Sequence, residues 1–221
     1  MKRTVTPELL DLDDWAAPAI ETALADLHRI NRWFGGFSSM TAILERIARR
    51  AGLRRISFLD VAGGSGEVAE QARERLRRRG IELEAVVSDR APSHLRTRLP
   101  SVAGDAVALP FRDGAFDVVG SNLFVHHLAP EQIRAFAREA LRVSRLAFVV
   151  NDLRRSPLHL ALVYAGLPLF RSHMTHQDAP ASVRAAFTLE EMCDILKDAP
   201  AARLETSTHY LYRMGVIAWK Q

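Results

Sequence analysis

Residues 59–66 read Leu59-Asp60-Val61-Ala62-Gly63-Gly64-Ser65-Gly66. An apolar strand predicted from Ile56 leads into this stretch, and the turn of small residues opens a helix predicted over residues 66–79. Glycines in such a turn let the backbone approach a ligand closely and adopt positive φ. The first N–H groups of the following helix are free to bind a polar or anionic group. In an open α/β sheet, ligands bind beyond the carboxyl ends of the strands, so this turn predicts a binding site there.

Two further acids follow the next β segments. Asp89 closes the apolar run 85–89, and Asp105 lies in Gly104-Asp105-Ala106 after a brief strand at 101–104. Any one of these acids alone would most simply be a turn or cap residue. Together with Asp60 they place three carboxylates at the ends of successive strands. The sequence therefore predicts a pocket for a nucleoside that carries no phosphate.

A dinucleotide site is the main competing interpretation. Residues 64–69 fit the G-x-G-x-x-A fingerprint, and Asp89 would hold ribose hydroxyls in either class of protein. A carboxylate at Asp60 would repel a pyrophosphate but suits an amino group, and Asp105 suits an exocyclic amine. The chain also lacks a recognisable Tyr-x-x-x-Lys pair. An NAD-dependent oxidoreductase remains an alternative.

Strands and helices alternate along most of the chain, which predicts an α/β fold with right-handed crossovers and a mostly parallel sheet. No helix separates the last two strands, so they are expected to form an antiparallel edge. The predicted strands are 56–61, 83–88, 101–104, 116–121, 146–151, 202–208 and 210–219. The predicted helices are 8–30 (one or two), 38–51, 66–79, a short one from Pro92, one from Pro130, and 188 to about 197. The expected fold class is a Rossmann-like, seven-stranded sheet.

We expect one domain over residues 1–221. Within it, residues 1–50 would form an N-terminal helical cap and residues 51–151 the cofactor-binding core. Residues 152–187 are too long for a plain loop and predict a helical lid inserted after the fifth strand. Residues 188–221 would supply the last helix and the edge strands.

Composition narrows the class of protein further. The 221 residues are 48% hydrophobic and 25% charged, as in ordinary globular proteins. The single cysteine, Cys193, fits a reducing compartment. No signal peptide and no membrane span is recognised, so a cytoplasmic location is expected. The net charge of +4 arises from arginine runs, notably residues 73–79. Without interleaved aromatics these runs favour solvated helix faces over a nucleic-acid surface.

The motifs together resemble class I S-adenosylmethionine-dependent methyltransferases. The resemblance is carried by the run 59–66, by Asp89, by residues 104–106, and by the segments 109–111 and 116–119. It is closest to the small-molecule branch that includes quinone-biosynthesis and natural-product enzymes, and it is strong over about residues 50–150. It implies S-adenosyl-L-methionine as the cofactor and a small-molecule methyl acceptor as the partner. Oligomeric state is left open.

The same resemblance implies roles for individual residues. Asp60 would contact the methionine amino group, Asp89 the ribose diol, and Asp105 with the Ala106 N–H the adenine. The full implied cofactor set is Arg32, Asp60, Ala62, Gly64, Gly66, Asp89, Arg90, Asp105, Ala106 and Asn122. Arg32 would pair with the methionine carboxylate. Ala62 departs from the family, which usually has a glycine there, and a positive φ at that position would weaken binding.

Two adjacent histidines, His126 and His127, follow the fourth strand at the expected active-site edge. One of them would be the catalytic base, and the other structural. His173 and His176 are spaced for a metal, but clustered ligands are lacking, so no metal site is expected. The predicted reaction is methyl transfer to a small, partly apolar molecule, with an oxygen acceptor first and carbon next. A non-catalytic nucleoside-binding or partner-binding domain and an RNA methyltransferase remain alternatives.

Overall fold

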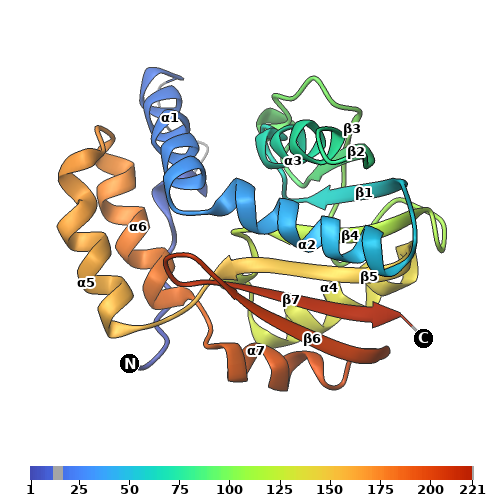
Figure 1. Cartoon of the computed structure of the whole chain (residues 1–221). Coiled ribbons are helices and arrows are strands. Elements are labelled where there is room, and N and C mark those ends of the chain that lie inside the picture. The colour runs from blue at the N-terminus through green and yellow to red at the C-terminus, as the bar shows by residue number, and fades with distance from the viewer. Residues whose placement is uncertain (12–16, 221) are drawn as a thin grey trace.

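The computed structural model describes residues 1–11 and 17–220. Its centre is a seven-stranded sheet in the order β3-β2-β1-β4-β5-β7-β6 (Figure 1). The strands are β1 (Arg55–Val61), β2 (Glu82–Asp89), β3 (Ser101–Ala103), β4 (Phe116–Asn122), β5 (Ser144–Leu153), β6 (Ala201–His209) and β7 (Arg213–Lys220). β1 to β5 are parallel, and β7 runs antiparallel to β5 and β6. The predicted fold class and the antiparallel edge are confirmed.

Helices cover both faces of the sheet. α2 (Gly36–Arg50) and α3 (Glu67–Arg77) pack on one face, against the side chains of Phe58, Val118 and Val149. α4 (Pro130–Val143) and α7 (Leu189–Leu196) pack on the other, against the alternate residues Leu59 and Val119 among others. Each central strand thus buries both of its faces, which explains its unbroken apolar sequence.

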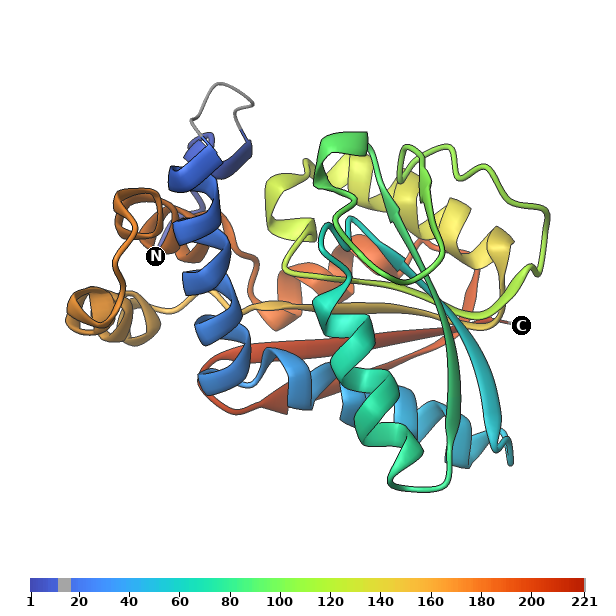
Figure 2. The ribbon, with the colours of Figure 1, turned by 90° about the horizontal axis from the view of Figure 1, so that it is seen from above.

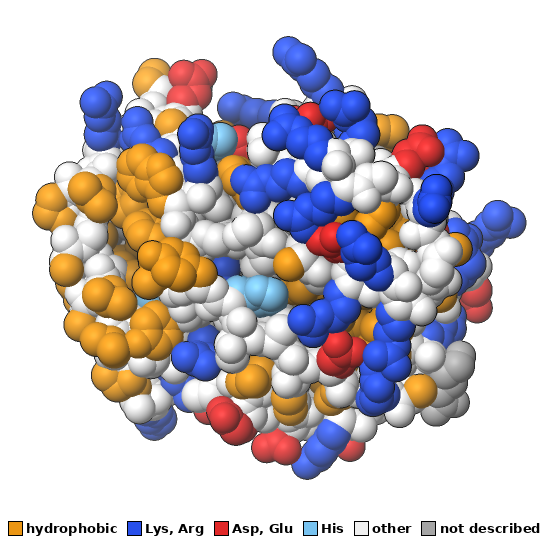
Figure 3. Space-filling model, viewed as in Figure 1, with side chains coloured by type: hydrophobic (Ala, Val, Ile, Leu, Met, Phe, Trp, Pro, Cys, Tyr) orange, Lys and Arg blue, Asp and Glu red, His pale blue; other side chains and the backbone are white. Residues whose placement is uncertain are grey.

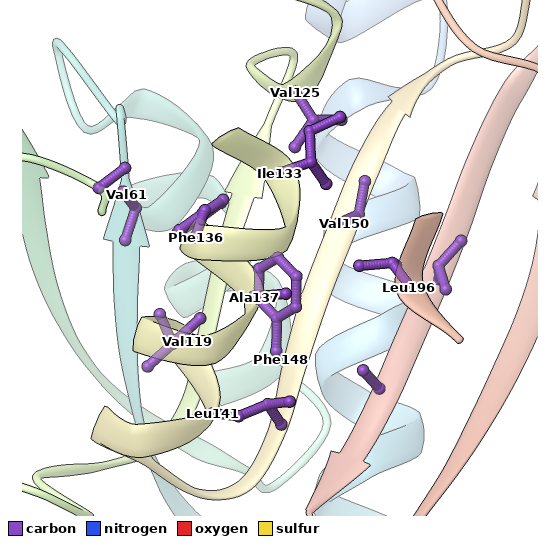
Figure 4. Packing of buried hydrophobic residues seen from close by; sticks show 14 of the residues in the cluster. Val61, Val119, Val125, Ile133, Phe136, Ala137, Leu141, Phe148, Val150 and Leu196 are labelled. Atoms are coloured by element: carbon purple, nitrogen blue, oxygen red, sulfur yellow. The ribbon is translucent and has the colours of Figure 1, made fainter. Parts of the chain in front are cut away.

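The packing of α4 shows how the core is filled. Its residues Ile133, Phe136, Ala137 and Leu141 recur at helical spacing and point at β4 and β5 (Figure 4). The Phe136 and Phe148 rings meet edge to face, with centroids 4.9 Å apart. This packing fixes the ends of β4 and β5, from which the site residues project.

Three helices stand beyond the carboxyl ends of the strands: α1 (Ala17–Trp33), α5 (Pro157–Gly166) and α6 (His173–Ala185) (Figures 1 and 2). α5 and α6, joined by the 3-10 turn Leu167–Leu169, make up the predicted insertion after β5. The expected cap over residues 1–50 divides in two, because α2 packs on the sheet and α1 faces the strand ends. α1 continues to Trp33, beyond the predicted end at residue 30, and Gly35 at φ 81 separates it from α2.

Short 3-10 turns complete the chain at Leu9–Asp11, Pro92–His94 and Val125–His127. The predicted helix start near residue 8 is therefore a single turn, and residues 12–16 lie outside the described residues. None of the described helices is long and apolar enough to cross a membrane.

Candidate active site

A cavity of about 1110 Å³ lies at the carboxyl ends of β1, β2 and β4, between the sheet and α1, α5 and α6. Most of the predicted site residues line it. They are Asp60, Ala62, Gly64, Asp89, Arg90, Asp105, Ala106, Asn122, His126 and His127. Gly66 and Arg32 are not among its described lining residues. The carboxyl ends of the strands thus bring most of the predicted residues together around one cavity.

Asp60 is a buried carboxylate at the end of β1. It is 1% exposed, and its Oδ1 has no hydrogen-bond partner among the described residues. Burial, and then the charge of Asp89, raise the pKa of Asp60 to about 7. A buried acceptor without a partner is costly, and a ligand that donates to it removes that cost. Asp60 therefore fits a bound cationic amino group.

The turn after β1 brings the backbone against the cavity. Ala62, Gly64 and Gly66 all have positive φ, at 57°, 50° and 70°. A Cβ built on Gly63 would lie 3.0 Å from the Asp60 carboxyl carbon, so a side chain there would displace that carboxylate. Gly66 serves the turn rather than the cavity wall, because its Cβ would lie 2.3 Å from the Thr97 hydroxyl. Ala62 thus has a left-handed backbone conformation, which costs an alanine more energy than a glycine. The replacement of the family's usual glycine by alanine is therefore unfavourable at this position.

Asp89 ties the turn to the end of β2. Its Oδ2 accepts from the Gly64 N–H at 3.2 Å, and its Oδ1 accepts from the Ala91 N–H at 3.1 Å. Each carboxylate oxygen can accept more than one hydrogen bond, so capacity for a pair of hydroxyls remains. Asp89 therefore lies in the cavity lining, and its role as a ribose-binding acid stays a prediction.

Asp105 lies at the cavity rim and is exposed. Its Oδ1 accepts from the Val107 N–H at 3.0 Å, which is a local turn bond. The turn orients the carboxylate and holds Ala106 as a buried neighbour. The two interpretations of this acid, turn residue and ligand acceptor, are compatible in this geometry.

A buried arginine occupies the part of the cavity where the sequence predicts Arg32 to act. Arg32 is exposed, because α1 turns Leu27, Ile30 and Asn31 toward the cavity and Arg32 away from it. Arg213, the first residue of β7, is 1% exposed and lines the cavity instead. Burial lowers its pKa to about 10, so it stays charged at neutral pH.

Arg213 joins three separate parts of the chain. It donates to the Phe34 carbonyl at 2.9 Å, to Asn31 Oδ1 at 3.1 Å and to Asn122 Oδ1 at 3.4 Å. Asn122 also accepts from Asn151 Nδ2 at 2.7 Å, so the predicted Asn122 is held in place at the end of β4. Sequence reasoning missed Arg213, although an arginine followed by six apolar strand residues, Met214 to Trp219, is a signal of this kind.

The two histidines differ sharply in environment. His126 is 3% exposed, and its Nδ1 lies 2.7 Å from Asp152 Oδ1 while its Nε2 lies 3.5 Å from Glu8 Oε1. Burial alone would lower the pKa of His126, but the charges and hydrogen bonds of Asp152 and Glu8 outweigh it and raise the pKa to about 10. At neutral pH His126 is therefore a protonated bridge between two carboxylates.

His127 is more accessible, with 26% of its side chain exposed and its Nε2 4.0 Å from Glu8 Oε2. Glu8, from the N-terminal segment, is a site residue that no pattern in the sequence could place. Among the residues that the structure describes, the possible ligand atoms of Glu8, His126 and His127 lie within 4.8 Å of one another. These three side chains are close enough together to hold a metal ion. The expectation of no metal site therefore stays a prediction.

The wall opposite the sheet is mainly apolar, with polar residues such as Thr175 and Asp178 of α6 among its members. Its apolar part is made by Leu24, Leu27, Phe34, Val163, Phe170 and Val183, from α1, α5, α6 and the turns beside them. Of four large apolar residues in the inserted segment, Tyr164, Leu167, Phe170 and Met174, only Phe170 is among the described residues that line the cavity. Tyr164 is 47% exposed, and Met174 is buried outside the described lining. Leu167 also lies outside that lining.

Residues 59–146 match a family model described as a methyltransferase domain. The chain is 36% identical over 116 residues to the ubiquinone/menaquinone biosynthesis C-methyltransferase UbiE of Dinoroseobacter shibae. That alignment covers 47% of this chain and 43% of the relative, so the chain matches less than half of the relative's length.

Solved structures share the fold. The plantazolicin methyltransferase BpumL, solved with a triazolic desmethylPZN analogue and S-adenosylhomocysteine, has a TM-score of 0.67 at 13% identity, over 93% of this chain and 92% of that one. A methyltransferase from Methanococcus maripaludis described as S-adenosylmethionine-dependent has a TM-score of 0.60 at 13% identity, over 95% and 98%. One from Aquifex aeolicus has a TM-score of 0.55 at 16% identity, over 80% and 89%.

Proposed function

We propose that this chain, which contains a class I S-adenosylmethionine-dependent methyltransferase domain, transfers a methyl group from that cofactor to a small, partly apolar acceptor. The observation that carries the proposal is the unpartnered, buried Oδ1 of Asp60 beside the turn at Gly63, where any side chain would push on that carboxylate. A pyrophosphate would be repelled by this carboxylate, whereas the ammonium of a methionine moiety would be bound by it.

The chain's own residues would hold the cofactor along the sheet edge. Asp60 accepts from the amino group, Asp89 from the ribose hydroxyls, and Asp105 from the adenine amine. When bound, the cofactor supplies a methyl group on a positively charged sulfur. The residues around it then need mainly to orient the acceptor, and positioning of two reactants contributes on the order of 7–11 kcal/mol to a lowered barrier.

We infer that His127 rather than His126 takes the acceptor's proton. His126 already holds a proton between Asp152 and Glu8, and its raised pKa of about 10 makes it a poor base at neutral pH. His127 lines the cavity beside Glu8, whose carboxylate can orient the ring. His126 would act as a positioning residue that holds Glu8 in place.

An oxygen acceptor, such as a phenol or enol, is our first choice, because a histidine base serves an ionisable hydroxyl directly. The apolar wall formed by α1, α5 and α6 suits a ring or alkyl substituent on that acceptor. A carbon acceptor is the second candidate, and it is favoured by the C-methyltransferase among the relatives. An activated carbon also loses a proton, so the role of His127 is the same in both.

An NAD-dependent oxidoreductase, an RNA methyltransferase and a domain without turnover have less support. Asp60 opposes the oxidoreductase. The arginines that suggest RNA are largely paired with acids on the surface: Arg77 and Arg78 contact Glu74, and Arg79 contacts Glu45. A non-catalytic domain is not specifically supported either, because the structure has an open cavity with an accessible histidine, His127, in its lining.

Two experiments test the proposal. Isothermal titration should show micromolar or tighter binding of S-adenosylhomocysteine and no binding of NAD; the reverse result would overturn it. A screen of phenols, enols and quinols with a labelled methyl donor should then yield a labelled product. If the variant His127→Asn forms no labelled product but still binds the cofactor, His127 is supported as the base. If the variant keeps full activity, no base is needed and the protein contributes by positioning the reactants only.

A further inference from the structure

Residues 157–169, which form α5 and the following 3-10 turn, make an unusual surface. Eight of these thirteen residues are exposed, and all eight are apolar. They are Pro157, Leu158, Ala161, Leu162, Tyr164, Ala165, Pro168 and Leu169. Leu158 and Leu169 are 58% and 59% exposed. We call this surface the α5 face; apolar side chains gather over the same region in the space-filling view (Figure 3).

This composition is that of a helix normally covered on all sides. A surface helix of a globular protein has a polar outer face, and one that is apolar all round is buried. α5 packs on α6 along one side and lines the cavity with His159 and Val163, and the rest of its surface faces outward (Figure 2). Contiguous exposed apolar surface of this kind marks a binding surface.

Arginines accompany the α5 face along the chain. From residue 153 to residue 177 the chain has three arginines and no acid; of these, Arg155 is buried and paired with Glu191. Arg171 is exposed at one end of the face, and Arg184 of α6 donates to the Tyr164 hydroxyl at 2.6 Å, at its edge. An apolar face with a basic rim is the composition of segments that lie in the interface of an anionic membrane.

We propose that the α5 face docks on the surface of an anionic lipid bilayer. A symmetric dimer through the same face would bring two basic rims together without acids to pair with them, so a second copy of this chain fits it less well. Leu162, Val163 and Gly166 belong both to this segment and to the cavity lining. When the α5 face is docked, the part of the cavity wall formed by α5 therefore lies next to the lipid. The proposal depends on the surface and not on the reaction assigned to the site.

Vesicle co-sedimentation tests the docking directly. Vesicles of phosphatidylcholine with about 30% phosphatidylglycerol should pull down the protein, and vesicles of phosphatidylcholine alone should do so at least about fivefold less well. The double variant Leu158→Ser/Leu169→Ser should lose at least about tenfold in binding. Neither leucine is among the described residues that line the cavity. The matched control is Tyr210→Ser, which removes a 69% exposed side chain from the β6–β7 turn and should bind as the parent does.

Titration with S-adenosylhomocysteine confirms that the double variant is folded, and failure of the parent chain to bind this ligand would count against the proposed function alone. Vesicle binding that is absent in the parent, or equal in the parent and the folded double variant, would overturn the docking proposal. A concentration-dependent dimer in sedimentation velocity that the double variant loses, with no vesicle binding, would assign the α5 face to a second copy.

Discussion

Asp60 shows how a single side chain can serve binding at the expense of stability. Its carboxylate is buried without a partner for Oδ1, close to the charge of Asp89, and its pKa is about 7. An unfolded aspartate titrates at about 4, so the folded chain binds an extra proton between these two values. Stability contributed by this residue is therefore present at acid pH and is lost as the pH rises toward 7.

The first prediction concerns Asp60→Asn. The amide cannot ionise, so above pH 7 the variant should be more stable than the parent, by on the order of 1–4 kcal/mol in free energy of unfolding. Urea denaturation at pH 4 and pH 8 measures the difference, which should nearly vanish at pH 4. Affinity for S-adenosylhomocysteine should fall at least about tenfold, since the amino group loses its anionic partner. A variant that binds with the parent's affinity would remove Asp60 from the site.

The second prediction is the pH dependence of cofactor binding in the parent chain. An ammonium requires ionised Asp60, whose pKa is about 7 in the free protein. Affinity for S-adenosylhomocysteine should therefore rise roughly fivefold from pH 6 to pH 7, reach about tenfold by pH 8 and change little above that. Calorimetry across this range checks it, with Asp60→Asn as the control that should show a flat profile. A flat profile in the parent would contradict the proposed contact.

Ala62 supplies the third prediction. Its φ of 57° costs an L-residue roughly 1–2 kcal/mol, which glycine avoids. Ala62→Gly should raise the free energy of unfolding by about 0.5–1 kcal/mol, since the greater freedom of glycine in the unfolded chain offsets part of the gain. Cofactor affinity should be equal or higher. Gly63→Ala should instead lower the free energy of unfolding, because its Cβ would push on Asp60. If that change stabilised the protein, this explanation of the turn would be wrong.

At the scale of elements, sequence was informative wherever a local pattern determines structure. The seven strands all follow from local patterns of apolar residues. Because the parallel strands end at the same edge of the sheet, the polar residues at their carboxyl ends, such as Asp60 and Asp89, were expected to lie there together. Residues that act through long-range packing were not predictable in this way.

Glu8 and Arg213 illustrate the limit. Glu8 meets His126 from the far end of the sequence, and Arg213 meets Asn31 across 182 positions. No periodicity links such pairs. The placement of α2 had the same difficulty, because its amphipathic pattern shows that it buries one face but not which surface covers it.

The fourth prediction concerns the start of α7. Thr188 Oγ1 accepts from the Glu191 N–H at 3.2 Å, and the Glu191 carboxylate accepts from the Thr188 N–H at 2.9 Å. Thr188→Ala should cost about 1 kcal/mol in free energy of unfolding. Ser156 provides the matched control, since it occupies the same position before α5 without a side-chain capping bond. Chemical denaturation of both variants measures this, and equal losses would show that the cap contributes nothing specific.

At the scale of the whole molecule, the N-terminal segment closes the cavity by bonds to distant elements. Arg3 donates to the carbonyls of His126 and Leu128, and the Leu9 and Leu10 N–H groups donate to Asp178 of α6. Glu8 lies between these contacts and reaches His126, which is bonded in turn to Asp152 of β5. A single imidazolium thus links the N-terminal segment to the sheet.

The last prediction follows from this link. The pKa of His126 is about 10 in the folded chain and near 6.5 when unfolded, so its stabilisation is complete below pH 6.5 and is lost as the pH rises through 10. The parent's free energy of unfolding should fall between pH 7 and pH 10, and that slope should be smaller in His126→Gln. Hydrogen exchange should show residues 3–10 opening first, since Glu8 loses its charged partner while the sheet keeps its core. Equal slopes in parent and variant, or opening that begins in the sheet, would mean that His126 does not carry the charge that holds the segment over the cavity.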